Sequence, residues 1–146
     1  YIPITTITEL DFGISKITHS IFLSGIDYTA ENLYDNGITH ILNVSTKEDK
    51  IYSGINNMFI NIPDGGDESI ENLSIEKYFP SSYAFIQNAI NADGKVLVHC
   101  HMCIFRSATI VIVYLMKTLN MPYVEVLAMV NAKHPSLTHV WHSHGT

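Results

Sequence analysis

The sequence predicts an α/β fold in which a mostly parallel central sheet carries helices on both faces. Strand-like and helix-like segments alternate along the chain, as they do in this class. Residues 95–99 (KVLVH) are almost continuously apolar, which is typical of a strand buried in a parallel sheet. Residues 108–119 are apolar on nearly every side and would form a helix covered by other elements. With 146 residues, the chain has the length of a single domain, which we expect to span 1–146.

The first half of the chain contains short apolar segments that we interpret as strands, at residues 20–25, 39–45 and 56–62. Between the first two, Thr29 is a typical N-cap for a helix, and Gly37 stands where a left-handed C-terminal residue belongs. Pro63 and the following Asp-Gly-Gly-Asp turn end the third strand. Residues 1–19 are mixed in composition.

In the second half we expect helices at 75–91, 108–119 and 122–133 and a strand at 95–99. Pro80 is expected in the first turn of its helix, where a missing N–H group is tolerated. The Asp93-Gly94 pair turns the chain into the apolar strand, and Pro135 ends the last helix.

The charge distribution argues against two classes of partner. The net charge is −6 and only eight residues are Lys or Arg, so no basic stripe is available for nucleic-acid phosphates or for an anionic membrane surface. The apolar run at 108–116 is too short to cross a bilayer, which takes roughly 20 residues. Cys100 and Cys103 lie in one segment and form no disulfide framework, so we expect a reducing compartment, the cytoplasm or the nucleus.

The segment HCHMCIFRS lies between the apolar strand and the apolar helix, and its residue types suit phosphate chemistry. Backbone N–H groups at such a junction converge on an anion at the positive end of the helix dipole. Arg106 can bind two phosphate oxygens, and the same field would lower the pKa of the Cys100 thiol. Ser107 can donate its hydroxyl to the sulfur. The alternative is that Cys100 is an inert packing residue and that the Cys-x5-Arg spacing arose by chance.

The motif formed by His99, Cys100, five residues, Arg106 and Ser107 resembles that of dual-specificity protein phosphatases, in the cysteine-dependent protein tyrosine phosphatase superfamily. The segments IFLSG, GITHILNVS and ENLS also follow in the family's order, and the resemblance covers roughly residues 14–135, leaving 136–146 as an atypical tail. The resemblance implies a tyrosine-phosphatase-like fold, phosphorylated protein substrates and a cysteinyl-phosphate intermediate on Cys100, with neither a metal nor another cofactor.

The resemblance also calls for an aspartic acid that protonates the leaving group. Counting back from the ENLS segment places Asp67 at this position, whereas counting forward from the preceding strand falls on Gly66. Asp64 is the competitor, because its IPDGG context is similar to the acid loop of tyrosine phosphatases. We favour Asp67.

The expected phosphate loop departs from the family at several positions. The loop comprises His101, Met102, Cys103, Ile104, Phe105, Arg106 and Ser107. Cys103 replaces a glycine, and a side chain there costs on the order of 1 kcal/mol if φ is positive. A weakened enzyme, or a pseudophosphatase that binds phosphorylated partners without hydrolysis, is therefore the alternative. A reversible Cys100–Cys103 disulfide is a further hypothesis, limited by the geometry that a disulfide requires. Three histidines in the tail, His139, His142 and His144, could bind a metal, although a simple polar tail is favoured. The sequence predicts no oligomeric state.

Overall fold

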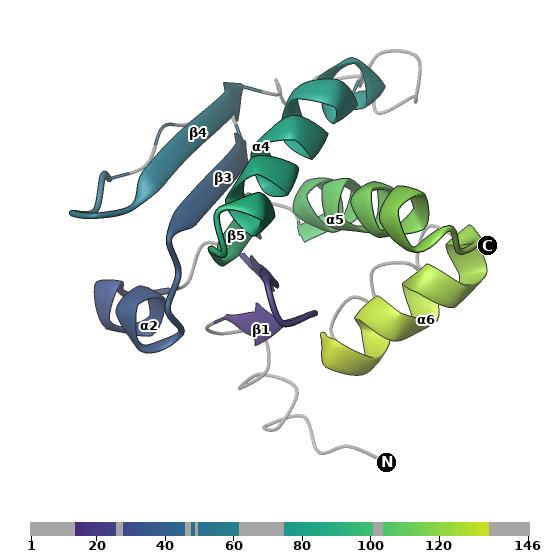
Figure 1. The fold of residues 1–146 in the computed structure, drawn as a ribbon, viewed down its shortest axis with the longest axis horizontal. Coiled ribbons are helices and arrows are strands. Elements are labelled where there is room, and N and C mark those ends of the chain that lie inside the picture. The colour runs from purple at the N-terminus through teal and green to yellow at the C-terminus, as the bar shows by residue number, and fades with distance from the viewer. Residues whose placement is uncertain are drawn as a thin grey trace.

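The computed structural model describes residues 14–25, 28–45, 48, 50–61, 75–100 and 104–134. These residues form a five-stranded sheet in the order β1-β2-β5-β3-β4 (Figure 1). The strands are β1 (Ser15–Lys16), β2 (Ile21–Ser24), β3 (His40–Ser45), β4 (Asn56–Asn61) and β5 (Val96–His99). Only β1 pairs antiparallel with its neighbour, β2, and the pairs β2–β5, β5–β3 and β3–β4 are parallel. The predicted mostly parallel sheet is thus confirmed.

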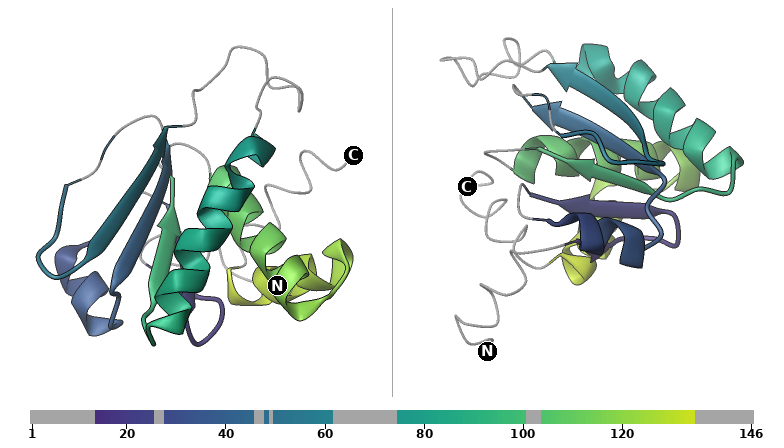
Figure 2. Two further views of the ribbon diagram at one scale, coloured as in Figure 1. Left: turned by 45° about the horizontal axis from the view of Figure 1, so that its top comes forward. Right: turned by 90° about the vertical axis from the view of Figure 1, so that its left-hand side faces the viewer.

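Helices cover both faces of this sheet, as predicted. They are α2 (Ala30–Asp35), the 3-10 helix η1 (Ile75–Tyr78), α4 (Phe79–Asn91), α5 (Ile104–Leu119) and α6 (Tyr123–Lys133). Figures 1 and 2 show α4, α5 and α6 packed as one layer, whereas α2 lies apart from them and buries Leu33 against the opposite face of the sheet. None of the helices in the described ranges combines the length and the apolar character that crossing a membrane requires.

The central strand β5 divides the core into two clusters because its side chains alternate between the two faces. Val96 and Val98 join the large cluster under α4, α5 and α6. Leu97 joins the smaller cluster, in which Leu33 of α2 packs on Phe22 of β2. All four residues of β5 are buried, as expected for a strand with helices above and below it.

Local sequence signals account for the ends of several elements. Thr29 and Asn32 form a capping box, since each side chain accepts a hydrogen bond of 3.1 Å from the other's backbone N–H group. Gly37 has a φ of +71°, the left-handed conformation expected of it. Pro80 lies in the first turn of α4, where a backbone N–H group has no intrahelical acceptor, so the missing N–H group of proline costs no helical hydrogen bond. The short strand β1 corresponds to no sequence signal that we identified.

The turn between α4 and β5 has no space for a side chain at Gly94. A β-carbon there would collide with the Thr39 hydroxyl and would lie 3.0 Å from the carbonyl oxygen of Ala89. The N–H group of Gly94 donates to that same carbonyl at 2.8 Å, which fixes the close approach. Glycine is therefore required here by the packing of the backbone rather than by a positive φ.

His40, at the start of β3, is held as a neutral imidazole. The Asn56 amide nitrogen lies 3.3 Å from Nε2, and Thr39 Oγ1 lies 2.7 Å from Nδ1. An amide N–H group donates to Nε2, so this nitrogen accepts and the ring proton lies on Nδ1. Desolvation by burial lowers the pKa of His40, in agreement with a neutral ring.

Candidate active site

Buried polar side chains gather at the carboxyl end of the three central strands. Ser24 of β2 and Asn43 of β3 both pair with His99 of β5, so the three side chains share one level of the sheet. Each is at most 3% exposed, although most of the surrounding core is apolar. Ligand sites of open α/β sheets lie outside this edge, where the strands end and the helices begin.

The thiol of Cys100 follows directly after β5 and lies against the beginning of α5. Its side chain is 1% exposed and is not in a disulfide. The Sγ atom is 3.4 Å from the hydroxyl oxygen of Ser107, which is fully buried in the first turn and a half of α5. A serine hydroxyl at this distance can donate to a sulfur that carries negative charge.

Arg106 also belongs to the beginning of α5, where its side chain is half-buried. The sequence placed the start of this helix at residue 108, but α5 begins four residues earlier, at Ile104. Ile104 and Phe105, expected in the loop, are therefore helical, as are Arg106 and Ser107. The apolar periodicity begins only at Ala108, which is why the first turn escaped detection. First-turn N–H groups lack intrahelical partners, so these residues can still contribute donors to an anion.

The ring of His99 contacts Tyr28, a residue that was not predicted from the sequence. The Tyr28 hydroxyl lies 3.2 Å from His99 Nε2, and the two rings meet edge to face with centroids 5.1 Å apart. Tyr28 directly precedes Thr29, the N-cap of α2. An aromatic residue just before an N-cap was the available signal, but it does not by itself indicate contact with a strand 71 positions further along the chain.

Several predicted site residues lie outside the described residues. They are Asp64, Asp67, His101, Met102, Cys103 and the tail histidines. The choice of the acid, the disulfide hypothesis and the tail's metal hypothesis therefore stay predictions. Across the described ranges, no group of three or more His, Cys, Asp or Glu side chains is arranged to hold a metal ion.

Comparisons with known proteins show the family to which the chain belongs. Residues 22–142 match the family model described as dual specificity phosphatase, catalytic domain. The chain belongs to the dual specificity phosphatase family. It is 33% identical over 122 residues to dual specificity protein phosphatase 22-A of Danio rerio, with 82% of this chain and 56% of the relative covered. It is 33% identical over 131 residues to dual specificity protein phosphatase 19 of Mus musculus, covering 88% of this chain and 57% of the relative. The chain thus spans just over half the length of these relatives.

A solved structure gives the same fold. The human tyrosine phosphatase-like serine/threonine/tyrosine-interacting protein superposes with a TM-score of 0.71 at 28% identity, covering 83% of each chain. Family membership and the predicted tyrosine-phosphatase-like fold are both confirmed. The motif that carried the sequence resemblance, from His99 to Ser107, lies at the β5–α5 junction, where the buried polar side chains gather.

Proposed function

We propose that this chain is the catalytic domain of a protein phosphatase that hydrolyses phosphotyrosine and phosphoserine or phosphothreonine through a cysteinyl-phosphate on Cys100. The observation that carries the proposal is the 3.4 Å approach of the Cys100 sulfur to the Ser107 hydroxyl across the β5–α5 junction. A buried serine beside a buried cysteine, with Arg106 in the same helical turn, suits a thiolate nucleophile better than an inert packing residue.

In the first step, the Cys100 thiolate attacks phosphorus and forms an S–P bond while the bond from phosphorus to the leaving oxygen breaks. Asp67 donates a proton to that oxygen, so a neutral phenol or alcohol leaves. Arg106 and the first-turn N–H groups of α5 stabilise the negative charge on the three remaining phosphate oxygens.

In the second step, a water molecule attacks phosphorus, and the Asp67 carboxylate accepts the proton that this water loses. The S–P bond breaks and its electron pair returns to Cys100 as a thiolate. Ser107 donates a hydrogen bond to the sulfur at this point, which makes it a better leaving group. Phosphate is released and Asp67 is again protonated, ready for the next cycle.

The substrates proposed are phosphorylated proteins in the cytoplasm or the nucleus. The proposed pocket is shallow enough to admit phosphotyrosine as well as the shorter phosphoserine and phosphothreonine. The second candidate function is a pseudophosphatase that binds phosphorylated partners without hydrolysing them. It is supported by the likeness to a protein described as a tyrosine phosphatase-like interacting protein, and by Cys103 at a position where the family has glycine.

The test is hydrolysis of p-nitrophenyl phosphate and of matched phosphotyrosine and phosphothreonine peptides. We expect turnover by the wild type, none by Cys100→Ser, and a loss of roughly 100-fold or more for Asp67→Asn at the pH optimum. Cys103→Ser replaces the other cysteine of the loop and shows whether the loss is specific to Cys100. Phosphopeptide binding without wild-type turnover would favour the pseudophosphatase, and a larger loss in Asp64→Asn than in Asp67→Asn would move the acid to Asp64.

A further inference from the structure

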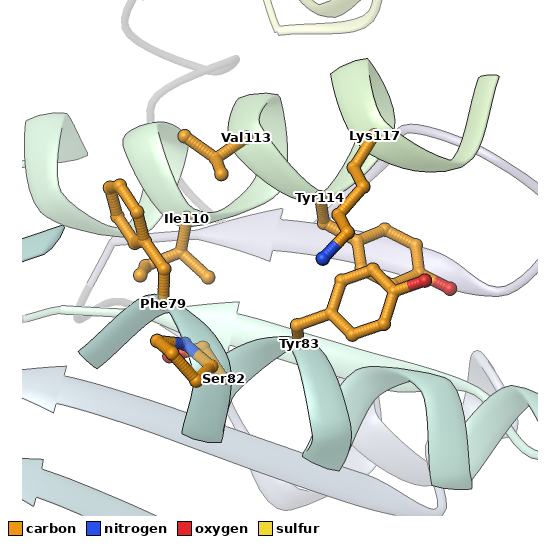
Figure 3. A pocket seen from close by; sticks show the side chains of 8 residues that line it. Phe79, Ser82, Tyr83, Ile110, Val113, Tyr114 and Lys117 are labelled. Carbon is orange, nitrogen blue, oxygen red and sulfur yellow. The ribbon is translucent and has the colours of Figure 1, made fainter. Parts of the chain in front are cut away.

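A pocket of about 400 Å³ lies between α4 and α5 (Figure 3). Its volume is within the range of sites that bind small molecules. Its lining residues lie between Phe79 and Lys117 and include neither Cys100 nor Arg106, so it is separate from the candidate active site. The mechanism proposed above assigns it no role.

Three aromatic rings form much of the pocket wall. Phe79 and Tyr83 come from α4 and Tyr114 comes from α5. The rings of Tyr83 and Tyr114 are tilted by 42° with centroids 5.1 Å apart, and the Tyr114 hydroxyl donates to Gln87 at 2.7 Å, which fixes its orientation. Offset and edge-to-face contacts are the favourable arrangements between aromatic rings, so this wall suits a planar aromatic guest.

The polar groups of the pocket are few and carry no negative charge. The Lys117 ammonium lies 4.6 Å above the Tyr83 ring, where the cation–π contact keeps it beside the pocket, and Figure 3 shows its nitrogen directed towards that ring. Burial and the neighbouring Tyr83 raise the pKa of Tyr114, so its phenol stays neutral. None of the described residues that line the pocket is acidic.

The hydroxyl of Ser82 is the second polar feature. Ser82 lines the pocket and is 1% exposed, and its Oγ atom makes no hydrogen bond with any of the described residues. A buried hydroxyl without a partner is unfavourable, and a polar atom supplied by a bound molecule would relieve that cost.

We propose that the α4–α5 pocket binds a small aromatic carboxylate. The aromatic ring packs among Phe79, Tyr83 and Tyr114, and the carboxylate pairs with the Lys117 ammonium. Because the chain carries a net charge of −6, its overall field disfavours anions, so the preference for a carboxylate over a neutral analogue comes from Lys117.

The experiment is a titration of the ¹⁵N-labelled chain with 2-naphthoate, followed by amide chemical shifts. We expect saturable shifts in α4 and α5 around the pocket, and the same shifts when inorganic phosphate saturates the Cys100 loop. Lys117→Met should weaken binding by about two- to fivefold, the amount that one partly exposed ion pair contributes. Lys133→Met removes another exposed cation, on α6, and should leave the affinity unchanged. The neutral 2-naphthamide should bind as weakly to the wild type as naphthoate binds to Lys117→Met.

Each of the following results would overturn the proposal. The first is the absence of saturable shifts at the pocket. The second is shifts that disappear with phosphate, which would place naphthoate at Cys100. The third is equal binding of naphthoate and naphthamide, or equal effects of Lys117→Met and Lys133→Met. The fourth is shifts at the pocket that grow with protein concentration alone, which would make a second copy of the chain the occupant.

Discussion

The contact between Cys100 and Ser107 makes a quantitative prediction about the nucleophile. Ser107→Ala removes the hydroxyl that lies 3.4 Å from the sulfur and leaves the thiol as buried as before. The hydroxyl stabilises a thiolate by donating to it, whereas burial alone disfavours the charged form. The substitution should therefore raise the pKa of the Cys100 thiol.

The size of this effect follows from the strength of a hydrogen bond to a charged group, about 1.5 kcal/mol at its lower end. One pKa unit corresponds to about 1.4 kcal/mol, so the pKa of the thiol should rise by roughly one unit. At a pH below both pKa values, the thiolate fraction falls about tenfold, and at a pH above both it does not change.

The assay is the rate of alkylation by iodoacetamide as a function of pH, measured in a Cys103→Ala background so that a single thiol reacts. The rate reports the thiolate fraction and does not require the chain to turn over any substrate. Ser82→Ala is the matched control, because it removes a buried serine hydroxyl from a different helix, α4, that makes no hydrogen bond with the described residues. An unchanged pH profile in Ser107→Ala, or an equal shift in Ser82→Ala, would refute the reasoning.

Three further predictions concern the fold. Ile86→Ala should lower the free energy of unfolding by about 2–5 kcal/mol, because the Ile86 side chain is fully buried. Ile51→Ala should change it by less than about 0.5 kcal/mol, because the Ile51 side chain is 75% exposed. Urea denaturation measures both free energies, and equal effects would contradict the assigned core. Gly94→Ala should lower the free energy of unfolding by about 1–3 kcal/mol, since the added carbon collides with a hydroxyl and crowds a backbone carbonyl. Gly25→Ala, with free space around the added carbon, should lower it by less than half as much in the same assay. Because the pKa of His40 is lowered in the folded chain, the unfolded chain binds a proton at a pH where folded His40 stays neutral. The free energy of unfolding should therefore decline as the pH falls below about 6.5 towards the folded-state pKa. His40→Asn should flatten this part of the stability–pH curve, and an unaltered slope would rule out His40 as its source.

Most of the architecture was predictable because the sequence patterns and the tertiary contacts agree. The nearly continuous apolar run at 95–99 contains the central strand, and Thr29 and Gly37 bracket α2 as their residue types indicate. The structure differs from the sequence prediction at β1 and at the start of α5, and each difference has a physical cause. β1 has two residues, too few to show a period, and it exists through pairing with β2. The first turn of α5 precedes the apolar periodicity that a sequence pattern detects.

The site was predictable where its residues are close in sequence. Cys100 and Ser107 belong to one motif, and the structure brings their side chains into contact. Tyr28 was not predictable, because its contact with His99 depends on β2 lying beside β5, a pairing of distant segments. The α4–α5 pocket was hidden for the same reason, as the two helices that form it are separated by the whole of β5.

The order of the strands also has a consequence for the chain as it is synthesised. β5 separates β2 from β3, yet it is the last of the five strands to leave the ribosome, so a nascent chain that ends before residue 96 carries two unpaired strand edges. Both cysteines, Cys100 and Cys103, follow β5 in the sequence. Residues 1–95, which include the first four strands, contain no cysteine, so no thiol within this segment can trap the incomplete sheet through oxidation or a mixed disulfide.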